Sequence, residues 1–238
     1  MRFVFVDEVY GSKELNFFGV GVLVVDATKY NPLFEAFYKT LKKHSWPVEK
    51  EIKGKYIFSR DPAKTGKTPE QMIVLTRDLT SSLLSAKSSR AELFFIFNKK
   101  GYSIENYLAL LAVAFTKIQK PTNQKNGKHL ASCFLDDFND LHAHHALVSE
   151  KLREAAGKRR YCLVDGTFSI VKSSNHSPGV IYADLLAYLA RWVAENPEVE
   201  PSTLFDLIVP DTGAVNAQKV LVARSLLFNR IKGYIIEI

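Results

Sequence analysis

The sequence predicts an α/β fold with a mixed β-sheet flanked by helices. Short runs rich in Val, Ile and Phe, typical of buried strands, alternate with longer segments that carry apolar residues at helical spacing. Apolar residues make up 47% and charged residues 24% of the 238 residues, close to the average of globular domains. We find no internal repeat and no low-complexity linker, so we expect one domain over 1–238, with 195–238 as a C-terminal helical extension.

Strands are expected where β-branched and aromatic residues form short runs between turn-forming residues. Gly19 and Gly21 inside the second of these runs indicate either close packing against a neighbouring element or a bulge. The expected strands are 2–7, 17–25, 91–98, 130–136 and 160–165, with shorter candidates at 168–172 and in the final GYIIEI.

Helices are expected where apolar residues recur every three or four positions behind a capping residue. Asn31, Thr68 and Ser103 are the predicted caps, and Pro32 and Pro69 suit a first helical turn. Basic loops are expected at 53–68 and 119–128, and one or two helices within 202–238. The expected helices are 31–43, 69–87, 103–118, 138–156 and 177–194.

Charge and cysteine content narrow the possible partners and the compartment. The formal net charge of +7 and a pI near 9.2 favour partners that carry phosphate, such as RNA or DNA, although a basic protein need not bind nucleic acid. Cys133 and Cys162 provide neither a disulfide framework nor zinc spacing, which favours a reducing cytoplasm. The charged N-terminus does not resemble a signal peptide, and no apolar run reaches the roughly 18 residues of a membrane helix, so we expect no membrane partner.

Four acidic residues stand in surroundings where an ionised carboxylate is costly. Asp7 follows Val-Phe-Val, Asp136 follows Cys-Phe-Leu, Asp184 interrupts an apolar helix, and Glu51 lies beside Ile52. Each of them alone could have a structural role, in a salt bridge or a capping hydrogen bond.

Taken together, the four acids suggest a metal site. The ends of neighbouring strands meet at one edge of an α/β sheet, and Asp184, in the second turn of its helix, could reach that edge. Clustered carboxylates repel each other, and Mg²⁺ or Mn²⁺, which prefer oxygen ligands, would relieve the repulsion. Two such ions roughly 4 Å apart can activate water against a phosphodiester. We find no convincing Ser-His-Asp or Cys-His arrangement that would compete with this chemistry.

At these residues the chain resembles the DUF3800 family of mostly bacterial and phage proteins with a predicted ribonuclease H-like fold. The family opens with a strand ending in Asp-Glu-Ser-Gly, for which the match is Phe5-Val6-Asp7-Glu8, followed by the glycine-containing strand 18–22. A Glu-x-Lys motif corresponds to Glu51-Ile52-Lys53, and a strand ending in Asp corresponds to Phe134-Leu135-Asp136. The helix reading Gly-x-Gln-x-Ala-Asp-Leu, which follows a Ser-rich turn, corresponds to 179–185.

The resemblance covers residues 3–192 and rests on the order and spacing of the motifs together. It implies that Asp7, Glu51, Asp136 and Asp184 bind Mg or Mn. Two departures concern loop geometry or substrate contacts: Val9-Tyr10 replaces the Ser-Gly, and Ile181 replaces the Gln.

Several neighbouring residues have open roles. Lys53 could contact a phosphate or pair with Glu51, and His176 could shuttle a proton, contact phosphate or simply be solvated. Asp137 competes with Asp136 as a ligand, because a one-residue slip turns a side chain to the other face of the strand. Glu8 could also be a ligand.

Two further patterns are better explained by structure. Residues 64–68 resemble the end of a phosphate-binding P-loop, but Asp61 stands where that motif requires glycine. His142 and His145 share a helical face, but no fourth zinc ligand accompanies them.

The sequence thus predicts a metal-dependent phosphodiester hydrolase, a nuclease, with Asp7, Glu51, Asp136 and Asp184 as ligands and Lys53 or His176 assisting. The alternatives are a catalytically inactive nucleic-acid-binding protein on the same fold and a strand-transfer enzyme. The pattern does not distinguish RNA from DNA and does not indicate an oligomeric state.

Overall fold

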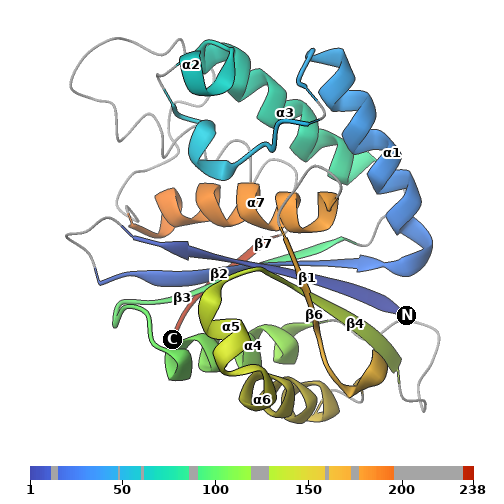
Figure 1. The fold of residues 1–238 in the computed structure, drawn as a ribbon, viewed down its shortest axis with the longest axis vertical. Helices are drawn as coiled ribbons and strands as arrows, with labels where there is room; N and C mark the ends of the chain where they lie inside the picture. The colour runs from blue at the N-terminus through green and yellow to red at the C-terminus, as the bar shows by residue number, and fades with distance from the viewer. Residues whose placement is uncertain are drawn as a thin grey trace.

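The chain forms a seven-stranded mixed β-sheet with helices on both faces (Figure 1). The computed structural model describes residues 1–11, 16–47, 49–59, 62–85, 91–118, 129–158, 161–172, 177–195 and 233–238. Along the sheet the strand order is β5-β4-β1-β2-β3-β7, and β6 also pairs with β4. The strands are β1 (Arg2–Tyr10), β2 (Phe18–Asp26), β3 (Glu92–Asn98), β4 (His129–Asp136), β5 (Tyr161–Leu163), β6 (Ser169–Val171) and β7 (Gly233–Glu237).

The central strand β1 has one antiparallel and one parallel neighbour. It pairs with β2 along its whole length, from Arg2 opposite Asp26 to Tyr10 opposite Phe18. Its parallel pairing with β4 is shorter and ends where Val6 lies opposite Leu135. The predicted mixed sheet is therefore confirmed.

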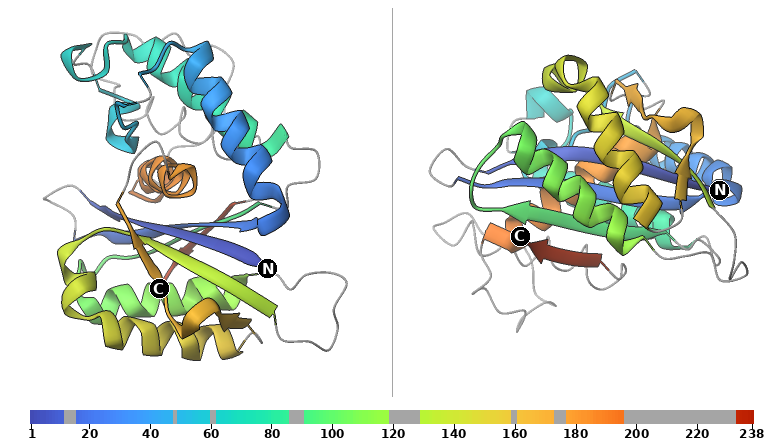
Figure 2. Two further views of the ribbon diagram at one scale, coloured as in Figure 1. Left: turned by 45° about the vertical axis from the view of Figure 1, so that its right-hand side comes forward. Right: turned by 90° about the horizontal axis from the view of Figure 1, so that it is seen from below.

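The helices lie in two groups on opposite faces of the sheet (Figures 1 and 2). On one face α7 lies against β1 and β2, with α1 and α3 beyond it, and α4 and α6 cover the other face. The helices are α1 (Ala27–Lys43), α2 (Pro62–Thr65), α3 (Pro69–Ser85), α4 (Ile104–Lys117), α5 (Asn139–Ala143), α6 (His145–Lys158) and α7 (Pro178–Glu195), with 3₁₀ turns at Gly54–Tyr56 and Val164–Gly166.

Two of the three predicted helix caps are confirmed. The Ser103 hydroxyl accepts a hydrogen bond from the Asn106 amide at 3.1 Å. Thr68 and Gln71 form a reciprocal capping box, in which each backbone amide donates to the other side chain.

The predicted start of the first helix was wrong. Helix α1 begins at Ala27, four residues before the expected cap Asn31, and Pro32 lies inside it. The sequence from 27 to 30 has no strong start signal, but the Ala27 amide donates to the Met1 carbonyl oxygen, which ties the helix start to the edge of the sheet. Strand β1 also continues past its predicted end, so Asp7 lies within the strand rather than at its terminus.

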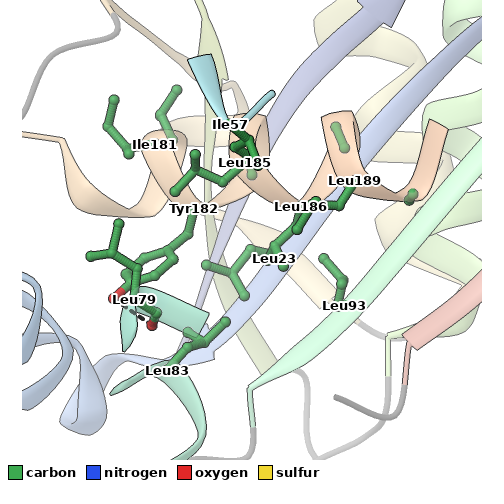
Figure 3. Packing of buried hydrophobic residues seen from close by; sticks show 14 of the residues in the cluster. Leu23, Ile57, Leu79, Leu83, Leu93, Ile181, Tyr182, Leu185, Leu186 and Leu189 are labelled. Carbon is green, nitrogen blue, oxygen red and sulfur yellow. Dashed lines mark hydrogen bonds between the residues drawn. The ribbon is translucent and has the colours of Figure 1, made fainter. Parts of the chain in front are cut away.

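Helix α7 lies unusually close to the sheet because small residues face each other there. A Cβ placed on Gly21 would lie 2.6 Å from the Ala187 Cβ, and one placed on Gly179 would lie 2.5 Å from the Phe5 ring. On its outer side α7 packs against α3, where Tyr182 lies beside Leu79 and Leu83 (Figure 3). The Tyr182 hydroxyl donates to the Leu79 carbonyl oxygen at 3.3 Å and lies 2.7 Å from the Ser82 hydroxyl. This close contact determines how near α7 side chains come to β1.

The C-terminal extension is described only at its end. Residues 196–232, where helices were expected, and the predicted loop 119–128 lie outside the described residues. The final strand is confirmed as β7, which pairs in parallel with β3. Among the described residues, no helix has the length and apolar character needed to cross a membrane.

Candidate functional site

The strand register places Asp7 and Asp136 next to each other. The β1–β4 pairing ends at Val6 opposite Leu135, and the two aspartates follow directly. Two positions earlier the rings of Phe5 and Phe134 stack with centroids 5.1 Å apart. Because side chains alternate along a strand, Asp7 and Asp136 point to the same face as these two rings, which is the face that α7 covers.

Asp184 reaches the same region from α7. Its Oδ2 accepts a hydrogen bond of 2.7 Å from the Gly54 backbone amide, at the start of the 3₁₀ turn. A side chain at position 54 would not fit, because its Cβ would lie 2.5 Å from the Tyr188 Cβ and 2.9 Å from Asp184 Oδ1. Gly54 therefore allows the 50s loop to approach α7 and orient the Asp184 carboxylate.

Glu51 and Lys53 belong to the same loop and pair with each other. Lys53 Nζ lies 3.1 Å from Glu51 Oε2, while the intervening Ile52 is fully buried in the core. The second carboxylate oxygen, Glu51 Oε1, is buried and has no hydrogen-bond partner among the residues that the structure describes. A buried carboxylate oxygen without a partner is costly, so this atom is a candidate for binding a cation or a donor group of a ligand.

Burial and mutual repulsion raise the pKa values of several of these carboxylates. Burial raises the pKa of Asp7 well above its usual range, and the charges of Asp184, Glu8 and Asp136 raise it further. The pKa of Asp184 rises to about 6 through burial, although the Gly54 amide and Lys53 favour its charged form. Burial of Glu8 and the nearby charge of Asp136 raise its pKa to about 7.

The environment of Lys53 shows that it faces several acids. Burial lowers its pKa, but hydrogen bonding and charge interaction with Glu51, and the charges of Asp184 and Asp136, raise the pKa above its usual value overall. Lys53 is therefore a permanent cation at the rim of the cluster. Lys53 was expected either to contact a phosphate or to pair with Glu51, and the structure shows the pairing with Glu51.

Glu8 lies next to the cluster but on the opposite side of β1. Even-numbered residues of this strand, such as Val4 and Val6, pack against α4 and α6. The charge of Glu8 accordingly contributes to the raised pKa values of Tyr102 and Tyr107 on that side. Its carboxylate is thus separated from the α7 face by the strand itself.

The structure distinguishes Asp136 from Asp137, the two alternative ligands at the end of β4. Asp136 is partly buried and its charge affects Asp7, Glu8 and Asp184. Asp137 is exposed and lies 2.7 Å from His142 Nε2, so it faces away from the cluster. His176, the other proposed assisting residue, lies outside the described residues.

Two observations support cation binding by these residues: the chemistry of their donor atoms and the buried oxygen Glu51 Oε1. Carboxylate oxygens are the ligands that Mg²⁺ and Mn²⁺ prefer, and Asp7, Asp136, Asp184 and Glu51 supply only such donors. Within the described parts of the chain, no three or more His, Cys, Asp or Glu side chains form a ready-made metal site. The carboxylates share one region, and binding a cation would require some of them to change rotamer.

Comparisons of this chain with protein-family models, curated proteins and solved structures found no match.

The structure adds two features that the residue pattern did not reveal. Gly54 acts through its backbone amide, and its only sequence signal was its position directly after the Glu-x-Lys motif. An aromatic cavity beside the carboxylates is lined by Phe3, Phe5, Tyr30 and Phe134, to which the residue pattern had given no functional role.

Proposed function

We propose that this protein is a metal-dependent phosphodiester hydrolase, a nuclease, that uses a carboxylate cluster on a ribonuclease H-like, DUF3800-type fold. The observation that carries the proposal is the convergence of Asp7, Asp136 and Asp184, from three separate elements, on one buried region between α7 and the sheet. A cluster of buried like charges lowers stability, so its presence favours a functional explanation.

The proposed ligands of Mg or Mn are Asp7, Glu51, Asp136 and Asp184. When bound, such ions activate water for attack on phosphorus and stabilise the leaving oxygen. The unpartnered Glu51 Oε1 supports this assignment, because a cation would satisfy it. Asp184 is already oriented by the Gly54 amide, so part of the donor set is preorganised.

Residues around the carboxylates would handle the charge of the substrate. Lys53 stands at the edge of the cluster with its pKa raised, so it stays charged and can contact a phosphate oxygen by exchanging its partner Glu51. The net charge of +7 would attract a polyanion to the protein. Nucleic acid is therefore the substrate class that we propose.

The test is cleavage of labelled single- and double-stranded RNA and DNA with Mg²⁺ or Mn²⁺, and with chelator. Asp7→Asn and Asp184→Asn should each reduce cleavage by more than about 100-fold, because a ligand should matter more than a residue that merely orients one. Asp137→Asn is the matched control, since this carboxylate is exposed and paired with His142. Cleavage that persists in both ligand variants, or in chelator, would refute the proposal.

A second candidate function is nucleic-acid binding without catalysis on the same fold. It is favoured by the Glu51–Lys53 ion pair, which neutralises one proposed ligand, and by the lack of a ready-made metal site among the described residues. Calorimetric titration with Mn²⁺ separates the two candidates. Nucleic-acid binding with neither Mn²⁺ uptake nor cleavage in any of these substrates would select the binding protein.

A further inference from the structure

A cavity of about 410 Å³ opens beside the carboxylate cluster, between β1, β4 and the first turns of α1 and α7. Its walls are mainly aromatic, formed by Phe3, Phe5, Tyr30 and Phe134. The rings of Tyr30 and Phe134 each stack against Phe5, with centroids 5.4 and 5.1 Å from it and interplanar angles of 20° and 17°, and the Phe3 ring meets all three edge-on. The cavity is thus lined by an aromatic cluster, and its volume lies within the range of small-molecule sites.

The cavity and the carboxylates occupy successive positions on the same two strands. Phe5 precedes Asp7 by two residues on β1, and Phe134 precedes Asp136 by two residues on β4. Residues two apart point to the same face about 7 Å from one another. The aromatic walls are therefore the immediate neighbours of the proposed metal ligands, along the same face of the sheet.

Helix α7 repeats this arrangement from the other side. Val180 lines the cavity, and Asp184 lies one helical turn later, about 6 Å further along the axis. Along α7 and the sheet, the aromatic cavity is therefore followed within one helical turn by the acidic residues. A ligand that spans both needs a flat apolar part joined at short distance to a part that binds cations.

The rim of the cavity carries polar groups suited to the edge of a planar ring. The exposed Asn31 and the half-buried Ser177 are both among the lining residues. The Tyr30 ring stacks on Phe5, and the Phe5 ring packs directly against Gly179, so this wall links α1 to the start of α7. Flat faces for stacking and a few donors and acceptors for ring edges are what a nucleobase requires.

We propose that this cavity holds one nucleobase of the nucleic-acid substrate, while a neighbouring phosphate lies at the carboxylates. The identification of the substrate rests on the proposed function, but occupation of the cavity by a base does not depend on metal or cleavage. A base can enter only when it is unstacked from its neighbours, so the preferred substrate is single-stranded or locally opened nucleic acid. Stacking on aromatic rings tolerates different bases, so little sequence preference is expected.

The first experiment uses the neutral nucleoside 2-aminopurine riboside without metal, which avoids repulsion between phosphate and the acids. Its fluorescence should be quenched on binding, and the methyl resonances of Val171 and Val180 should shift while those of Val148, on the opposite face, stay unchanged. Ala27→Phe should fill the cavity and weaken binding about 10-fold or more. Thr28→Phe, on the exposed neighbouring position, should bind as the wild type does.

Absence of binding in the wild type, or unchanged Val171 and Val180 methyls, overturns the base-binding inference even if Ala27→Phe fails to fold. Equal affinity of folded Ala27→Phe and wild type also overturns it. A second experiment places an abasic residue at successive positions of a single-stranded substrate. Slower cleavage at one position relative to the scissile phosphate supports the inference, and uniform cleavage at all positions overturns it. Nucleoside binding in the cavity without any cleavage would instead refute the nuclease proposal and leave the base site standing.

Discussion

The face of the sheet that packs against α4 and α6 is lined by large apolar side chains, whereas the face beneath α7 also holds the carboxylates Asp7 and Asp136. On the first face Val22 and Phe94 are fully or almost fully buried within a continuous core. On the second, the sheet approaches α7 closely at Gly21, beside packed apolar side chains such as Leu23 and Leu186 (Figure 3). The comparison teaches that apolar burial stabilises both faces, while the face beneath α7 also loses part of that stability because it holds like charges together.

The largest expected effect is on the apolar face. Phe94→Ala should lower the free energy of unfolding by about 3–5 kcal/mol, because it removes a buried ring and leaves a cavity. Denaturant unfolding followed by circular dichroism measures the change. A loss below about 1 kcal/mol would show that this face does not carry the main core.

On the α7 face, the expected effect of a small added group comes from overpacking. Gly21→Ala should cost about 1–3 kcal/mol, because the new Cβ would lie 2.6 Å from the Ala187 Cβ and 2.8 Å from the Ala183 carbonyl oxygen. Moving α7 away should also displace Asp184 and reduce cleavage. The matched control is Gly157→Ala, at a helical glycine with open space around it, which should instead stabilise by about 0.5–1 kcal/mol. Equal outcomes for the two variants would contradict the close-approach explanation.

Removing one charge from the cluster should stabilise the metal-free protein. Asp7→Asn is expected to raise the free energy of unfolding by about 1–2 kcal/mol near neutral pH, and the melting temperature by about 2–8 °C. In the wild type, saturating Mn²⁺ should stabilise by about 3 kcal/mol at 100 times its dissociation constant, and Asp7→Asn should lose most of that gain. Calorimetric melting with chelator and with Mn²⁺ measures both. A destabilised Asp7→Asn in chelator would mean that the carboxylate has a structural role.

The same cluster predicts how stability depends on pH. Burial and mutual repulsion raise the folded-state pKa values of Asp7, of Asp184 to about 6 and of Glu8 to about 7. Carboxyl groups with raised folded pKa values bind protons more tightly in the folded state, so their contribution to stability is present at low pH and is lost as pH rises through those values. Metal-free wild type should therefore lose this contribution between about pH 4 and about pH 7, and the advantage of Asp7→Asn should shrink toward acid. Urea titrations across this range measure how the free energy of unfolding changes with pH. A stability that rises with pH in the wild type but not in Asp7→Asn would contradict the raised pKa values.

The smallest effect is expected outside the cluster. Asp137→Asn removes one exposed carboxylate that hydrogen-bonds His142, which should change stability by less than about 1 kcal/mol and leave cleavage unaffected. A strong loss of cleavage would show that Asp137, not Asp136, serves the site.

Local patterns along the chain predicted most elements of the fold. Alternating Val and Phe residues located the strands, and the capping signals at Thr68 and Ser103 located two helix starts, because both depend on interactions within a few residues. The start of α1 was missed because a contact between the Ala27 amide and the distant Met1, directly before β1, decides it rather than a local cap. The predicted end of β1 was short because pairing with β2 continues the strand past the apolar run.

For the candidate site, the sequence by itself determined which residues are unusual: Asp7, Asp136 and Asp184 stand in apolar runs, where a charge needs a reason. Only the tertiary structure decided that these three lie close together, that Gly54 orients Asp184, and that Glu8 and Asp137 point elsewhere. The physical reason is that strand register and the distance between α7 and the sheet arise from contacts between residues far apart in the chain. The sequence shows that an acidic residue lies in an apolar run, where its burial is costly. The residues that interact with it come from distant parts of the chain and meet only on folding.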